Sequence, residues 1–358
     1  SEMLDPRGES PLSDGRTEAI DRFEDATLDR PHLFRRWLSF SGIQLFVAVF
    51  LFFLVFLILS LSTDSFLSGQ NLANLFRSFS WLAIVAIGQG LVIIIGGIDL
   101  SVGATMALSG LIAGRSMQLG LPVVPAILCG LLTGAIIGWL NGTLVARFRL
   151  PAFVVTLGSM GIQRGIAFSL TGGWSVTNLP EPFLHLGQGN VSLGIGSVPV
   201  PLLIALTLAL VIGLFLRRTV IGSDIYAMSS GERALVVSGV NVTRLKVFVY
   251  TLCGLLAAMG GILLASRLGL AAPGSAVGYE VDVVAAAVIG GASLFGGVGS
   301  IRGVLLGAAI TQMLNNGLVL LGYPSYWQTA VICTLMLLTV LLDYWRRQGE
   351  MVRYETSA

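Results

Sequence analysis

The residues best suited to chemistry form one short polar block between two apolar stretches. Gly96-Gly97-Ile98-Asp99-Leu100-Ser101-Val102-Gly103 combines a carboxylate and a hydroxyl with glycines on both sides. A carboxylate inside a membrane segment costs about 2.5 kcal/mol or more, so such a group indicates a functional site. Each flanking glycine weakens a helix by about 1 kcal/mol relative to alanine. An interrupted helix with a carboxylate is typical of polar pathways near the membrane centre.

Other polar residues inside the apolar stretches either line such a pathway or join helices. Side-chain hydrogen bonds between membrane helices contribute only about 0.6 kcal/mol on average, which favours helix packing for most of them. Arg164 lies about two-thirds of the way across its segment and needs water or a partner, for which Asp99 is one candidate. Asn315-Asn316 before Gly317 predicts an interrupted helix, because Asn and Gly are weak helix formers. The candidate pathway or helix-break residues are Gly96, Gly97, Asp99, Ser101, Asn141, Thr156, Arg164, Asn315 and Asn316.

The chain lacks the motifs of common membrane-bound enzymes and ATPases. Its one lysine, Lys246, follows a leucine, so the G-x-x-x-x-G-K-[ST] phosphate loop is absent. Neither His32 nor His185 belongs to an H-E-x-x-H motif or a nucleophile pair, and the three cysteines show no C-x-x-C spacing. We expect no catalytic residue, no metal and no cofactor in this chain, so that another subunit or an ion gradient supplies its energy.

The composition is that of an integral membrane protein. Of 358 residues, 54% are hydrophobic and 11% are charged, against about 25% charged residues in soluble proteins. Stretches long enough for the ~20-residue helix that crosses a bilayer recur along nearly the whole chain. They are continuous apolar runs rather than strands of alternating polarity, which excludes an outer-membrane barrel.

Ten apolar segments predict an all-α membrane protein, a polytopic bundle of about ten transmembrane helices. We expect the helices near 42–61, 80–98, 101–119, 122–146, 151–171, 199–216, 247–267, 283–300, 303–322 and 327–345. Fourteen basic residues near helix ends fall on one side of this arrangement and three on the other, which places both termini in the cytoplasm. The predicted domains are a cytoplasmic tail (1–40), a transmembrane domain (41–345) and a second cytoplasmic tail (346–358).

Glycine spacing predicts two close helix contacts and an internal similarity. One helical stripe carries glycine at every fourth position: Gly130, Gly134, Gly138 and Gly142. Another helix is expected to pack against this stripe, and Gly303 with Gly307 repeats the pattern. Residues 96–103 and 290–297 match at four of eight positions. Transporters often contain internal repeats, but glycine-rich windows also match by chance, so both interpretations stay open.

Several ordered motifs resemble the permease subunits of ribose-type sugar ABC importers, carbohydrate uptake family 2 of the branched-chain amino-acid/sugar permease superfamily. The similar stretches are 95–103, 139–146, 151–158, 164–165, 238–242, 288–300 and 314–317. They cover the chain from about residue 70 to 345. Residues 292–297 look more like the sugar branch than like the amino-acid permeases. The resemblance implies a type II-like ABC importer permease, a transport subunit without its own ATPase site.

The resemblance also implies the partners and the reaction. A second copy of the chain, two ATPase domains that bind ATP and Mg, and a periplasmic sugar-binding protein would assemble in the bacterial inner (cytoplasmic) membrane. The lipid bilayer is a further expected partner, and no nucleic acid is expected. The permease would move a monosaccharide or related polyol from periplasm to cytoplasm by alternating access. Two alternatives stay open: an ion-coupled secondary transporter in which Asp99 carries a proton or cation, and an amino-acid or autoinducer ABC permease.

The longest cytoplasmic loop, about 219–246, indicates one or two short helices at the membrane face, with a plain solvated connector as the alternative. The resemblance implies that this loop docks on the ATPase. Residues implied in this coupling are Asp224, Gly231, Glu232, Arg233, Ala234, Ser238, Gly239 and Asn241. The match is imperfect, because Ser229-Ser230-Gly231 and Ala234-Leu235 replace the small-residue pair and the paired alanines common in relatives. The individual contacts of the loop therefore stay open.

Overall fold

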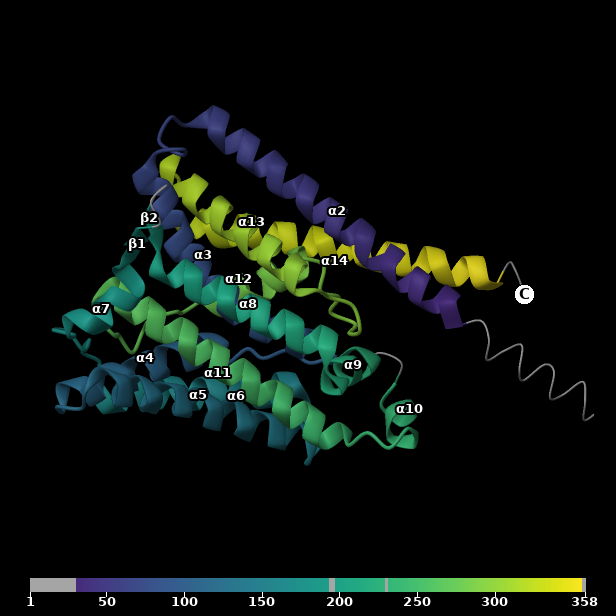
Figure 1. Cartoon of the computed structure of the whole chain (residues 1–358), viewed down its shortest axis with the longest axis horizontal. Coiled ribbons are helices and arrows are strands. Elements are labelled where there is room, and N and C mark those ends of the chain that lie inside the picture. Colours follow the sequence, from purple (N-terminus) through teal and green to yellow (C-terminus); the bar gives the residue numbers. More distant parts are fainter. Residues whose placement is uncertain (1–29, 193–196, 229–230, 356–358) are drawn as a thin grey trace, which may run out of the picture. The chain divides into compact units, whose positions relative to one another are not determined.

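The computed structural model describes residues 30–192, 197–228 and 231–355, and helices dominate them. Thirteen helices and two short strands follow one another in this part of the chain (Figure 1). The chain divides into residues 1–44 and residues 45–358. The first part holds the beginning of the first helix, and the second part holds every later element.

Eight helices within the described residues are long and apolar enough to cross a bilayer. They are α2 (Arg30–Ser62), α3 (Gly69–Ile94), α5 (Val123–Ala146), α6 (Ala152–Thr171), α8 (Val200–Arg218), α11 (Val242–Leu268), α13 (Ile301–Leu320) and α14 (Tyr326–Glu355). The shorter helices are α4 (Val102–Gln118), α7 (Glu181–Gln188), α9 (Val220–Ala227), α10 (Glu232–Val237) and α12 (Tyr279–Ile289). Strands β1 (Asn190–Ser192) and β2 (Ser197–Pro199) pair antiparallel. The prediction of a polytopic helical membrane protein is confirmed.

Each of the ten predicted segments corresponds to a helix, but the third and the eighth are short. Helix α4 has 17 residues and α12 has 11, so α12 is only about 16 Å long and cannot cross a ~30 Å hydrocarbon core. The prediction of a continuous helix over 283–300 is wrong. Helix α12 ends at Ile289, and Gly291 then adopts a φ of +90°. Residues 290–300 carry no charge, so hydropathy does not reveal this helix end, although five of these eleven residues are glycine.

Two predicted helices extend beyond their apolar windows. Helix α2 begins at Arg30, well before the predicted start near 42, and Pro31 occupies a position where proline suits a helix start. Helix α14 continues to Glu355. Parts of both predicted tails, 1–40 and 346–358, are therefore helical. Residues 1–29 and 356–358 lie outside the described residues.

Helices α3 and α11 form the centre of the bundle. Residues of their apolar windows are 89% and 67% buried, against 44% or less in the other six. Helix α11 contacts α3, α4 and α5. In the other six long helices fewer than half of the window residues are buried, which leaves apolar side chains for lipid or a further chain to cover. The helix break predicted around Asp99 therefore follows α3, the most buried of the eight long helices.

The predicted glycine stripe on α5 packs against α11, which confirms the expectation of a close helix neighbour. A methyl group added at Gly134 would collide with the carbonyl oxygen of Gly254, and one added at Gly138 would collide with that of Tyr250. Gly303 and Gly307 pack in the same way against the α12 segment. Small residues thus let backbones approach closely at both predicted contacts.

Candidate functional site

The structure places a helix break at the polar block of the sequence. Helix α3 ends at Ile94, helix α4 begins at Val102, and residues 95–101 between them are not helical. Gly96 has a φ of +79°, and its N–H donates to the Ile93 carbonyl oxygen at 2.9 Å. Gly97 N–H donates to Val92 O, also at 2.9 Å. This glycine-dependent pattern satisfies the last carbonyls of a helix, which explains why α3 ends here.

Asp99 fixes the turn that leads into α4. Its carboxylate accepts hydrogen bonds from the backbone N–H of Ser101 at 2.8 Å and from the Ser101 hydroxyl at 2.6 Å. Only 2% of Asp99 is exposed. A carboxylate that accepts from its own backbone two residues on stabilises a turn rather than a helix. The side chain is therefore a positioning group of the break in this conformation.

Side chains of three helices hold this turn through further contacts. Asn141 on α5 donates to the Ser101 hydroxyl at 3.0 Å. With its amide oriented to satisfy both backbone groups of Asp99, Gln89 on α3 donates to the carbonyl at 3.1 Å and accepts from the N–H at 3.2 Å. Thr156 on α6 lies 3.3 Å from the Ile98 carbonyl oxygen. The structure thus gathers Asp99, Ser101, Asn141 and Thr156 around one turn, with Gln89 added to the predicted set.

Arg164 has other partners than Asp99, which the sequence offered as one candidate. Its Nη1 donates to the carbonyl oxygens of Pro273 at 3.1 Å and Ser275 at 2.6 Å. Both carbonyls belong to the non-helical connection between α11 and α12, where backbone acceptors lack helical partners. Glu280 is the acidic residue that interacts electrostatically with Arg164. Arg164 on α6 therefore holds the connection between α11 and α12. The sequence analysis did not predict that this connection lies beside α6.

Asn315 and Asn316 do not interrupt a helix, because α13 is continuous from Ile301 to Leu320. Asn316 and Asn71 on α3 exchange hydrogen bonds of 2.8 and 3.0 Å. Asn315 donates to the carboxylate of Asp282 on α12 at 3.3 Å. These tertiary bonds override the low helix propensity of the pair. The two residues lie apart from the Asp99 turn and join α13 to its neighbours.

The two glycine blocks that resemble each other in sequence are in contact. Gly297 N–H donates to the Ile94 carbonyl oxygen at 2.8 Å, and a methyl group on Gly296 would lie 3.3 Å from the Gly96 backbone. Both helices before the blocks end at a glycine of positive φ, Gly96 and Gly291. By their places at the helix ends, Gly96 corresponds to Gly291. This correspondence is shifted by one residue from the sequence alignment of 96–103 with 290–297, which gave four identities.

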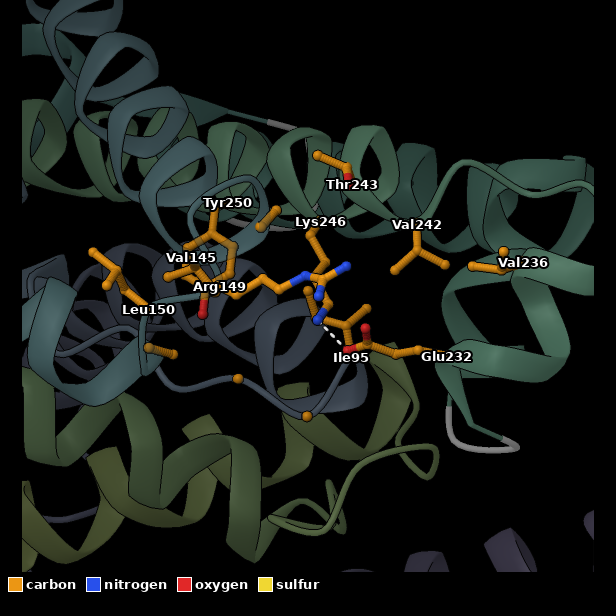
Figure 2. A pocket seen from close by; sticks show the side chains of 14 residues that line it. Ile95, Val145, Arg149, Leu150, Glu232, Val236, Val242, Thr243, Lys246 and Tyr250 are labelled. Atoms are coloured by element: carbon orange, nitrogen blue, oxygen red, sulfur yellow. Dashed lines mark hydrogen bonds and ion pairs between the residues drawn. The ribbon is translucent and has the colours of Figure 1, made fainter.

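A cavity of about 440 Å³ opens beside the break. Its lining comes from the break, from the connection between α5 and α6, and from α10 and α11 (Figure 2). Gly96 and Gly97 contribute backbone, while Arg149, Glu232 and Lys246 contribute charged side chains. The cavity therefore brings the predicted break and the predicted coupling loop together.

The predicted coupling loop folds as two short helices, α9 and α10. Gly231, with a φ of +105°, precedes α10, and Gly239, with a φ of +84°, follows it. The Ser238 hydroxyl donates to Ala234 O at 3.0 Å, and the Asn241 side chain accepts from Arg244 N at 3.0 Å at the start of α11. Asp224 lies on α9 and Arg233 on α10. The departure noted at Ser229-Ser230 lies outside the described residues.

One ion pair joins α10 to α11. Lys246 Nζ pairs with the Glu232 carboxylate at the edge of the cavity (Figure 2). Tyr250 follows one turn later on α11, and its hydroxyl lies against Gly97 in the break. Residues four apart on a helix share one face. The face of α11 that carries Lys246 and Tyr250 therefore connects the coupling helix to the break.

The contact between Gly97 and Tyr250 gives a first prediction. Gly97→Ala should lower the thermal stability of the purified protein, because the new methyl would collide with the Tyr250 hydroxyl and such overpacking costs about 1–3 kcal/mol. Gly97→Ala combined with Tyr250→Phe should recover most of the melting temperature, because Phe lacks that hydroxyl. Equal melting temperatures of the single and the double variant would contradict the contact.

The sequence also resembles known proteins. The family model for the permease component of branched-chain amino acid transport systems matches residues 71–340. The ribose import permease protein of Haemophilus influenzae is 41% identical over 290 residues, which cover 80% of this chain and 88% of that protein. The Bacillus subtilis ribose import permease protein is 39% identical over 309 residues (86% and 95%). The L-arabinose ABC transporter permease protein of Azospirillum brasilense is 36% identical over 299 residues (84% and 87%). No solved structure matches the chain.

Proposed function

Because this chain belongs to the permease family of branched-chain amino acid transport systems and to its ribose-type sugar branch, we propose that it moves a monosaccharide or related polyol into the cytoplasm by alternating access. The chain is a multi-pass sugar ABC permease. Identity of 41% to a ribose import permease over 80% of this chain carries the proposal. Its relatives are transport subunits, so the residues around Asp99 position helices and perform no bond chemistry.

The working unit of this proposal contains more than one chain. It comprises two copies of this permease, two ATPase domains that bind ATP and Mg, and a periplasmic sugar-binding protein, in the bacterial inner membrane. Helix α10 supports an ATPase contact, because Val237 is 88% exposed beside the charged residues Glu232 and Arg233. An exposed apolar side chain among charges suits a surface that another protein covers.

Movement of α10 would reach the break through α11. ATP-driven closure of the ATPase pair would displace α10, and the ion pair from Glu232 to Lys246 would pass this displacement to α11. Tyr250 on the same helix contacts Gly97, so the break would move with it. The break is suited to such a motion, because residues 95–101 lie between two helices and contain Gly96 at positive φ.

Two observations argue against the alternative functions. An ion carrier needs a carboxylate that can exchange protons or cations with a pathway, whereas Asp99 is 2% exposed and accepts two hydrogen bonds from Ser101. An amino-acid or autoinducer permease is disfavoured because the relatives described above are named for ribose and L-arabinose.

Co-purification tests the proposed assembly. The chain is expressed with an ATPase and a sugar-binding protein of a ribose-type importer from the same organism, and the detergent-extracted complex is isolated through a tag on the permease. We expect a stoichiometric complex with the ATPase whose ATP hydrolysis rises when the liganded binding protein is added. Isolation of the permease alone, or hydrolysis that ignores the binding protein, would contradict the proposal.

Charge reversal tests the connection between α10 and α11. Glu232→Lys should lower ATP-driven sugar uptake about two- to fivefold, since a partly exposed ion pair contributes up to about 1 kcal/mol. The same loss is expected for Lys246→Glu. The double reversal, Glu232→Lys with Lys246→Glu, restores the pair and should restore uptake. If the double variant transports no better than the single variants, the ion pair does not transmit the motion.

A further inference from the structure

We propose that the cavity between α10 and the helix break binds a phosphate group carried by a small cytoplasmic molecule or by a lipid. The cavity is lined by Arg149, Lys246, Tyr250 and Thr243 around the backbone of Gly96 and Gly97. Family membership assigns no ligand to this place.

The charges that line the cavity leave one cation without a counterion. Lys246 and Glu232 neutralise each other as an ion pair, with 18% and 58% of their side chains exposed. Arg149 has no hydrogen bond or ion pair within the part of the chain that the structure describes. Its backbone is left-handed, with a φ of 54°, which is uncommon for a residue with a side chain. A planar guanidinium with free donors recognises the oxygens of phosphate.

Tyr250 supplies an independent indication of a ligand. The residue is 1% exposed, and its hydroxyl has no hydrogen-bond partner among the described residues. It lines the cavity (Figure 2), and its hydroxyl lies against Gly97. Buried hydroxyl groups are normally hydrogen-bonded to protein or to ordered water, so an unpartnered one at a cavity wall indicates an acceptor from outside the chain. The hydroxyl is covered by its neighbours, and a phosphate oxygen would accept its hydrogen bond once it turns from Gly97 toward the cavity.

Size and charge together narrow the class of ligand. A volume of about 440 Å³ lies in the range of ~300–1,000 Å³ that small-molecule sites occupy. It exceeds the need of inorganic phosphate alone and suits a sugar phosphate or the headgroup of an anionic lipid. Arg149 is exposed, and a neutral sugar would offer its guanidinium no charged acceptor. The shared chemistry is therefore a phosphate with an organic substituent.

Binding measurements on the purified full chain test the site. Glucose 6-phosphate is titrated calorimetrically into the detergent-solubilised protein, with glucose and inorganic phosphate as comparison probes. We expect glucose 6-phosphate to bind, inorganic phosphate to bind more weakly, and glucose not to bind. The lipid source is tested by comparing melting temperatures in nanodiscs of phosphatidylglycerol and of phosphatidylcholine. Stabilisation by phosphatidylglycerol that depends on Arg149 would assign the site to a headgroup.

Variants separate the site from general charge effects. Arg149→Gln should weaken binding about tenfold or more, because it removes charge-assisted hydrogen bonds, and Tyr250→Phe should weaken it about threefold. Arg147→Gln is the matched control, since Arg147 is an exposed cation of the same connection that does not line the cavity. Should Arg149→Gln fail to fold, Arg149→Lys and Tyr250→Phe give the answer. Arg149→Lys keeps the charge and should bind more weakly than the parent.

Three results would overturn the proposal. These are the absence of binding by both phosphate probes together with no effect of phosphatidylglycerol, equal binding of glucose and glucose 6-phosphate, and equal losses in Arg147→Gln and Arg149→Gln. Any effect of the bound phosphate compound on the coupling of ATP hydrolysis to sugar transport would rest on the proposed transport function. The binding measurements need neither an ATPase nor transport, so a failure of one proposal is distinguishable from a failure of the other.

Discussion

Gly134→Val is expected to remove nearly all folded protein from detergent extracts. A side chain at this position of α5 would meet the carbonyl oxygen of Gly254 and the Ala258 side chain of α11. The contact is reciprocal, because a side chain at Gly254 would meet the Gly134 carbonyl oxygen. Backbone cannot rotate away as a flexible side chain can, so the two helices must separate. Overpacking of a core costs about 1–3 kcal/mol even where neighbours adjust. Fluorescence-detected size-exclusion chromatography measures the folded yield.

Gly213→Val is the matched control for this substitution. Gly213 lies within the membrane helix α8, and a methyl group there would meet no atom within 4 Å. The same change of residue type should therefore leave the folded yield near that of the parent. A Gly134→Val protein with the yield and melting temperature of the parent would show that α5 and α11 do not pack as described.

Asp99→Leu is expected to abolish sugar uptake by the complete transporter. Leucine removes the acceptor of both Ser101 hydrogen bonds, so a backbone N–H and a hydroxyl remain buried at the turn. Each unsatisfied buried group costs about 1–3 kcal/mol, enough to change the conformation of residues 95–101. Asp99→Asn keeps one carbonyl oxygen that can accept from Ser101 and should retain most of the uptake. Radiolabelled sugar uptake, normalised to folded protein, measures both variants.

The Asp99→Asn variant also separates positioning from ion carriage. An amide can hold the turn but cannot carry a proton, so a positioning group tolerates it. If Asp99→Asn is well folded and stops uptake while ATP hydrolysis by the partner continues, the negative charge itself is required. The hydrogen-bonded turn would then be a consequence of that charge rather than its purpose.

Apolar stretches in the sequence predicted the membrane helices, because burial in lipid demands runs of apolar residues whatever the tertiary contacts. Helix ends were harder to predict. The run over 283–300 remains uncharged after α12 ends at Ile289, and only its glycines, with Gly291 the first in a left-handed conformation, mark the change. At the other break, Asp99 interrupts the apolar run and made the helix end visible.

Tertiary partners explain the other differences. Arg164 was expected near Asp99 because both are charged, but the carbonyl oxygens of Pro273 and Ser275 satisfy it instead. Only the path of the connection before α12 reveals these acceptors. Asn316 was expected to disturb its helix, yet its exchange of hydrogen bonds with Asn71 stabilises the helical form. Single-sequence propensities contain no information about such distant partners.

The cavity was not predicted as a site, although the sequence contained its parts. Gly97 belonged to the break and Glu232 to the coupling loop, and both line the cavity. Helix α11 joins them, through the ion pair of Lys246 with Glu232 and the contact of Tyr250 with Gly97. Arg149 was counted only as a basic residue at a helix end. Sequence patterns identify helices and motifs, whereas the juxtaposition of α10 with residues 95–97 depends on the packing of α11.

Sugar uptake into proteoliposomes tests most directly whether this chain is a permease driven by partner ATPase subunits. The chain is reconstituted alone or with its ATPase, and the liganded binding protein is added outside. Vesicles contain ATP or no nucleotide, with and without a proton or sodium gradient. We predict accumulation of labelled sugar only when ATPase, binding protein and internal ATP are all present. Accumulation by the chain alone, driven by an ion gradient without ATP, would contradict the proposed function.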